Sequence, residues 1–158
     1  MKHTVAIALT VGALIGAAGA ALAADNVSLP KGYEKWAKSK ARVEPDRKSM
    51  FYGIHYIYVD KKAMKGYKTG GTYPEGSQFV AVNYSIKNEG GKQVPGKKTM
   101  IVVMKRDKKQ TATGGWQFAG FSPDGKPSGL DPVRDCFGCH EKDAKDRNFV
   151  ISTYANFK

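Results

Sequence analysis

The 158-residue sequence is poor in cysteine, histidine and acidic residues, and these shortages exclude several classes of protein. Two cysteines are too few for a disulfide-rich scaffold. After the N-terminus no apolar run is long enough to cross a bilayer, so we expect no membrane span in the mature protein. With 41% hydrophobic residues and a mean hydropathy of −0.45, the chain has the composition of one globular domain rather than of a disordered segment.

The N-terminus has the features of an export signal. Lys2 gives a positive start, residues 5–22 are apolar, and Ala21-Leu22-Ala23 fits an A-x-A cleavage site. A membrane anchor is the alternative, but glycines interrupt the apolar run and a hydrophilic stretch follows at once. We predict a signal peptide at residues 1–23, a single domain at residues 24–158 and a periplasmic location, where disulfides persist.

The order of predicted elements indicates an α+β fold, mainly an antiparallel β-sheet with a few short helices. Asp60 is the predicted N-cap of a helix that ends at Gly70-Gly71, and residues 31–42 show a second helical pattern. Residues 88–96 predict an open hairpin loop. Aromatic and β-branched residues predict strands at residues 50–59, 78–86, 100–104, 115–121 and 149–153.

One motif carries specific chemistry. Cys136-Phe137-Gly138-Cys139-His140 is C-x-x-C-H, the attachment signature of c-type haem. Two thiols on one turn can each add to a vinyl group of the same porphyrin, and the adjacent imidazole then lies under the iron. We therefore predict one covalent haem c per chain, held by Cys136 and Cys139, with His140 as the proximal ligand. Its other ring nitrogen should donate to a backbone carbonyl or a water.

Three other readings of the cysteine pair compete with haem attachment. A structural disulfide is compatible with export but needs no His140. A thioredoxin-like redox pair normally opens a helix in a βαβ unit, a context that this sequence lacks. A structural zinc site needs four ligands, and after the export signal the chain offers only His55 besides the motif.

An electron-transfer cytochrome would need a sixth ligand on the other side of the iron. Small cytochromes c carry the haem motif near the N-terminus, whereas here it follows all the main predicted strands. A six-coordinate electron carrier remains an alternative. Its candidate ligands are His55, Met50, Met64, Met100 and Met104.

Several short motifs follow one another along the chain in a characteristic order. They are Tyr33-x-x-Trp36, residues 57–60, Gly70, Pro74-Glu75-Gly76, residues 103–106, Gly115-Trp116 and residues 136–140. This order resembles cytochrome c′-beta and its hydroxylamine-oxidising relatives of the cytochrome P-460 family. The resemblance implies an antiparallel sheet that covers the distal face of the haem, and a homodimer. It does not extend to the four-helix-bundle cytochromes c′.

Distal residues separate the two branches of this family. The enzymatic branch has a lysine cross-linked to the porphyrin and a carboxylate that relays protons; the corresponding positions here are Ala81 and Ile101. The resemblance to the c′-beta branch implies a distal pocket that is capped by phenylalanine side chains. Phe51 and Phe79 fit that cap by strand alternation. His55 occupies the position of a polar distal residue in the cross-linked branch.

The resemblance therefore implies a gas-binding protein rather than an enzyme. NO or CO would bind at a five-coordinate iron beneath the cap, with a role in NO buffering or defence against nitrosative stress. Hydroxylamine oxidation is the alternative function. With 26 basic residues against 14 acidic ones, the net charge of +12 suits a solvated basic surface or an acidic redox partner. Export argues against nucleic acid as a partner.

Overall fold

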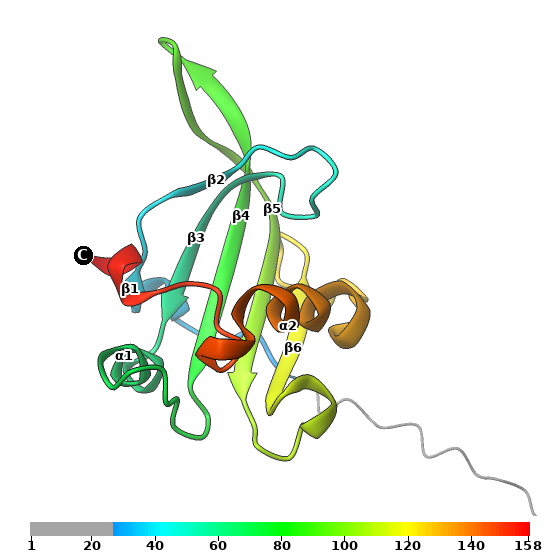
Figure 1. Cartoon of the computed structure of the whole chain (residues 1–158). Coiled ribbons are helices and arrows are strands. Elements are labelled where there is room, and N and C mark those ends of the chain that lie inside the picture. Colours follow the sequence, from blue (N-terminus) through cyan, green and yellow to red (C-terminus); the bar gives the residue numbers. More distant parts are fainter. Residues whose placement is uncertain (1–26) are drawn as a thin grey trace, which may run out of the picture.

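The computed structural model describes residues 27–158 and confirms the α+β fold. The predicted signal peptide lies outside the described residues. Strand order in the antiparallel sheet is β1-β3-β4-β5-β6, with β2 also paired to β3 (Figure 1). The strands are β1 (Ala37–Lys38), β2 (Arg42–Glu44), β3 (Gly53–Val59), β4 (Gln78–Glu89), β5 (Lys92–Arg106) and β6 (Trp116–Phe121).

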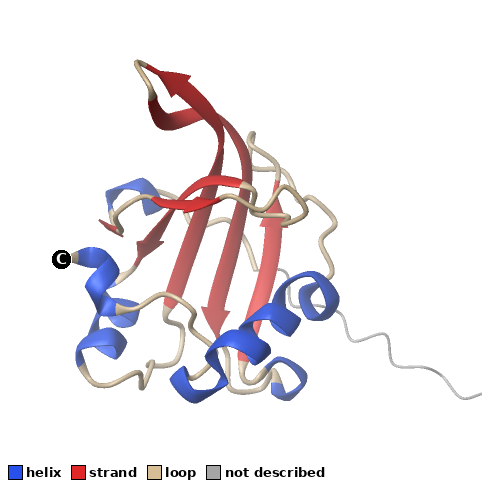
Figure 2. Ribbon diagram, turned by 45° about the horizontal axis from the view of Figure 1, so that its top comes forward, coloured by secondary structure: helices blue, strands red, loops and turns tan. Residues whose placement is uncertain are grey.

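Short helices surround this sheet (Figure 2). None of the helices in residues 27–158 is long and apolar enough to cross a membrane. They are α1 (Lys61–Lys68), α2 (Gly138–Ala144), the 3-10 turns η1 (Tyr33–Lys35), η2 (Thr111–Thr113), η4 (Lys145–Arg147) and η5 (Tyr154–Phe157), and the π-helical segment η3 (Pro132–Phe137).

Alternation along the strands builds one core on each face of the sheet. One core holds the side chains of Val59, Phe79, Met104 and Trp116 together with those of the C-terminal helices. The opposite core holds Tyr33, Tyr58, Val80, Val82, Ile101, Val103 and Phe121. Segment η3–α2 and the chain after it cross the first face, so residues 132–158 cover the sheet there (Figure 1).

The helix α1 forms where the sequence predicts it. The Asp60 carboxylate accepts a hydrogen bond from the Ala63 amide at 2.7 Å, which satisfies one of the free donors at the helix start. The Gly71 amide donates to the Gly66 carbonyl at 2.9 Å, so the chain turns away just after the helix.

Three local predictions are wrong. Residues 31–42 form η1 and β1 rather than one helix, because pairing of Ala37 and Lys38 with β3 overrides the helical pattern. The predicted open loop is a tight hairpin, since β4 runs to Glu89 and β5 starts at Lys92. Residues 149–153 do not form a strand.

Candidate functional site

The cysteine–histidine motif faces the sheet across a cavity of about 280 Å³. The segment η3 carries Cys136, and α2 carries Cys139 and His140. All three residues line this cavity, and the two cysteines are not joined to each other. The sheet contributes apolar side chains to the opposite wall: Ile57, Phe79, Ala81, Val102, Met104 and Phe118.

Segment η3 is held at its start by Asp131. The carboxylate of Asp131 accepts hydrogen bonds from the amides of Val133 and Arg134 at 2.9 and 2.7 Å. The π-helical turns that follow lead directly into α2 and bring Cys136 to the cavity, where its side chain is buried. π-Helical turns are rare and are often found at functional sites.

His140 is oriented by the backbone of Phe149. A carbonyl oxygen can only accept, so the 2.7 Å contact between His140 Nδ1 and the Phe149 carbonyl places the proton on Nδ1. The lone pair then belongs to Nε2, the nitrogen available for a metal. This geometry matches the predicted second bond of a metal-binding imidazole. The ring of Phe118 packs against the imidazole, with 5.0 Å between ring centroids.

Burial dominates the titration of two residues in the motif. It lowers the pKa of His140, although the bond to Phe149 and the Asp143 carboxylate oppose this effect. The imidazole is therefore neutral at neutral pH, as a metal ligand must be. Burial, followed by the carboxylates of Asp135 and Asp131, raises the pKa of the Cys136 thiol to about 11.

Four of the five predicted distal residues line the cavity: Phe51, His55, Phe79 and Ala81. Phe51 precedes β3 instead of lying within it. The prediction that Ile101 lines the cavity is wrong. Across the β4–β5 ladder Ala81 pairs with Val102, so Val102 faces the cavity and Ile101 packs in the core on the other side of the sheet.

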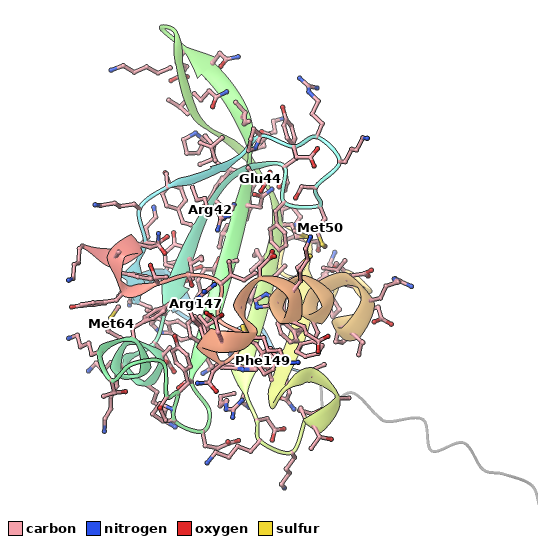
Figure 3. The ribbon with its side chains drawn as sticks, viewed as in Figure 1. Arg42, Glu44, Met50, Met64, Arg147 and Phe149 are labelled. Carbon is pink, nitrogen blue, oxygen red and sulfur yellow. The ribbon has the colours of Figure 1, made fainter. Side chains whose placement is uncertain are left out.

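Two of the candidate sixth ligands line the cavity. These are His55 and Met104. Met100 packs at the edge of the adjoining core, while Met50 is 40% exposed. Met64 belongs to α1, and Figure 3 shows it on the opposite side of the molecule from Met50.

Arg42 and Glu44 are cavity residues that the sequence did not reveal. Both belong to β2, and in the β2–β3 ladder Arg42 pairs with His55 (Figure 3). Glu44 is the only sheet carboxylate among the described residues that line the cavity. A strand of three residues has too little alternation to predict which face its side chains occupy.

A family model described as cytochrome P460 matches residues 30–152, which is most of the chain and includes all the described residues that line the cavity. A search of curated proteins gives no match.

Proposed function

Because the chain belongs to the cytochrome P460 family and is therefore a haem-binding cytochrome, we propose that it holds one haem c covalently through Cys136 and Cys139. His140 would be the proximal ligand. The observation that carries this proposal is the hydrogen bond from His140 Nδ1 to the Phe149 carbonyl at 2.7 Å, which leaves Nε2 for the iron. Both thiols line the same cavity as this imidazole.

We propose that the distal side takes a small neutral gas, NO or CO. A bound haem supplies the iron to which such a ligand attaches. The chain supplies an apolar wall in which Phe51, Phe79 and Val102 exclude water. Ala81 lies between Ile57 and Val102 of the neighbouring strands, and its small side chain would leave room for a ligand on the iron. A diatomic gas needs no proton delivery, so this wall suits it.

Hydroxylamine oxidation is the second candidate, and Glu44 and His55 favour it. Both side chains line the cavity and can accept protons, which the binding of a gas does not require. Against this candidate, no lysine is among the described residues that line the cavity, so a lysine cross-link to the porphyrin has no donor there. Gas binding is therefore our first proposal.

The deciding experiment is the optical spectrum of the purified holoprotein, oxidised and dithionite-reduced, before and after addition of NO and CO. A high-spin five-coordinate spectrum that shifts with either gas supports gas binding. A low-spin spectrum indifferent to both gases contradicts it and points to electron transfer with His55 or Met104 as sixth ligand. Turnover of hydroxylamine with an electron acceptor would instead establish the enzyme.

Haem attachment has its own test. The peptide that contains Cys136 and Cys139 should carry the mass of one haem, and both thiols should resist alkylation in the denatured holoprotein. Replacement of either cysteine by alanine should leave a single thioether. A haem that is extracted by acid and organic solvent would overturn covalent attachment.

We also propose that the protein is exported to the periplasm after cleavage behind Ala23, and that it forms a homodimer. The first proposal rests on the A-x-A pattern and the second on the family resemblance. The intact mass of the periplasmic protein tests cleavage, and light scattering tests the dimer. An acidic redox partner should bind more weakly as salt is added.

A further inference from the structure

His55 has a buried nitrogen without a partner. The residue is 9% exposed and lies on β3, at the cavity wall. Its Nδ1 is buried and makes no hydrogen bond to any of the described residues. A buried polar atom in this state costs free energy unless a small polar molecule satisfies it. Because Nδ1 is the buried nitrogen, Nε2 is the one that reaches the cavity.

Asn83 has the complementary unpartnered atom. It lies directly opposite His55 in the β3–β4 ladder and is 3% exposed. Its Nδ2 donates to the Tyr52 carbonyl at 3.1 Å and to Thr99 Oγ1 at 3.0 Å. The carbonyl can only accept, so the amide cannot be turned the other way. This leaves Oδ1, a pure acceptor, buried and without a partner.

We propose that Asn83 positions His55, through one bridging water, as a hydrogen-bond acceptor for the distal ligand of the haem. Opposite residues of an antiparallel pair have Cβ atoms about 5 Å apart, so the two side chains are near enough for one water to join their unpartnered atoms. The water accepts from Nδ1–H of His55 and donates to Oδ1 of Asn83. The proton of the neutral imidazole then resides on Nδ1, and Nε2 presents a lone pair to the cavity.

The charged neighbours of His55 are Arg42 and Glu44, both on β2. Burial lowers the pKa of His55, Arg42 lowers it further, and Glu44 opposes them. The imidazole is therefore neutral at neutral pH and has only one proton to place. Arg42 can only donate, which favours a lone pair on the imidazole. The Glu44 carboxylate accepts its hydrogen bond from the Asp46 amide, at 3.1 Å, rather than from His55.

The consequence concerns the class of ligand and rests on the proposed haem site. A lone pair near the iron stabilises a ligand that carries an N–H or O–H, such as hydroxylamine or water. It gives no such help to NO or CO, which lack protons. His55 would thus select between protic and aprotic ligands within a wall that is otherwise apolar.

The tautomer of His55 can be measured directly by ¹⁵N NMR of the diamagnetic ferrous protein, as the CO complex or, if CO does not bind, as the six-coordinate low-spin form. We expect the proton on Nδ1. In Asn83→Leu the acceptor is gone, and the ratio of the tautomers should shift toward Nε2–H by about tenfold, the effect of one lost hydrogen bond. Thr99→Val is the matched control, because it removes a partner of Asn83 Nδ2 but leaves Oδ1 in place. A proton on Nε2 in the unmodified protein, or His55 bonded to iron, would overturn the proposal.

The C–O stretching frequency of the ferrous CO form is the second measurement. A lone pair beside the ligand oxygen opposes electron donation from iron into CO, which raises the frequency, whereas an N–H lowers it. We expect the C–O stretching frequency of the unmodified protein to be higher than that of His55→Leu. We expect the frequency of Asn83→Leu to be lower than that of His55→Leu. The reverse order would contradict the proposal. If CO does not bind, the proposed gas binding fails, while the NMR measurement still decides the tautomer even if Asn83→Leu does not fold.

Discussion

The indole Nε1 of Trp116 donates a hydrogen bond to the backbone carbonyl of Asn148 at 2.9 Å, and this bond indirectly supports His140, the proposed proximal ligand. Asn148 and Phe149 both have positive φ angles, 51° and 63°, which non-glycine residues rarely adopt. The Phe149 amide donates to the Ala144 carbonyl at 2.7 Å. Together these bonds hold the strained turn so that the Phe149 carbonyl faces His140.

Replacing Trp116 by Phe should therefore affect both stability and the proximal ligand. The Asn148 carbonyl loses its donor, so we expect the free energy of unfolding to fall by about 1–3 kcal/mol. A looser turn should broaden the iron–histidine stretching band in the Raman spectrum of the ferrous protein. Trp36→Phe is the control, since Trp36 packs against the core on the other face. Equal effects of the two substitutions would show that Trp116 has no special relation to His140.

Phe51 and Phe79 both line the cavity, but they differ in their packing. Phe79 is 4% exposed, and its ring centroid lies 5.4 Å from that of Tyr73 and 5.7 Å from that of Trp116. Phe51 packs beside His55, with 6.1 Å between ring centroids. We expect Phe79→Ala to lower the free energy of unfolding by about 3–5 kcal/mol, and Phe51→Ala by under about 2 kcal/mol.

Both substitutions should nevertheless speed the binding of CO, because each opens the distal wall. Stopped-flow mixing of the reduced protein with CO measures this rate, and urea unfolding measures the stability. A Phe51→Ala variant that binds CO at the unchanged rate would remove Phe51 from the cap. A Phe79→Ala variant of unchanged stability would show that Phe79 is not part of the core.

The pH dependence of stability should reveal the burial of His55. Its pKa in the folded protein is lowered, chiefly by burial, from the ordinary value of 6.5. Below pH 6.5 the unfolded chain binds a proton that the folded protein does not. The stabilising effect of the neutral residue is thus complete above about pH 6.5 and is lost as the pH falls toward the folded pKa.

We expect the free energy of unfolding to decrease with falling pH by up to about 1.4 kcal/mol per pH unit from this one group. His55→Leu should lack this component while retaining that of His140, so the difference between the two proteins isolates His55. Parallel curves of stability against pH for the two proteins would mean that the pKa of His55 is not lowered by folding.

The sequence predicts the parts of the fold that depend on local chemistry. The C-x-x-C-H motif, the Asp60 cap and the alternation that turns Phe79 and Ala81 to one face are local patterns, and the structure has each of them in place. Which β5 residue faces the cavity depends instead on register with a distant strand. A shift of one residue in the register moves every side chain of a strand to the other face of the sheet. Such a shift separates the predicted cavity residue, Ile101, from the observed one, Val102.

Pairing between strands also explains the unexpected length of the β4–β5 hairpin. Pro95 and Gly96 normally interrupt strands, yet Pro95 pairs with Ile86 beyond the region where β6 covers β5. A register shift between Tyr84 and Ile86 marks an irregularity of the ladder at this point, which is where a strand accommodates proline. The contribution of Glu44 to the cavity likewise arises from pairing of β2 with β3, and no local sequence pattern predicts it.

Gly53 connects the distal wall to the sheet, and its replacement should disturb both. It begins β3 with φ at 135°, and a Cβ there would overlap the carbonyl oxygen of Tyr84 on the neighbouring strand. Gly53→Ala must therefore strain the backbone and displace β4, so we expect a loss of more than about 2 kcal/mol in the free energy of unfolding. Because Glu44 pairs with Gly53 and Phe51 lies two residues before it, CO binding should also change.

Gly70→Ala is the control: its φ is also positive, at 77°, but its Cβ would meet no atom within 4 Å. It should cost about 1–2 kcal/mol and leave CO binding unaltered. Similar losses in the two variants, with CO binding unchanged in both, would show that the contact between Gly53 and Tyr84 does not shape the cavity.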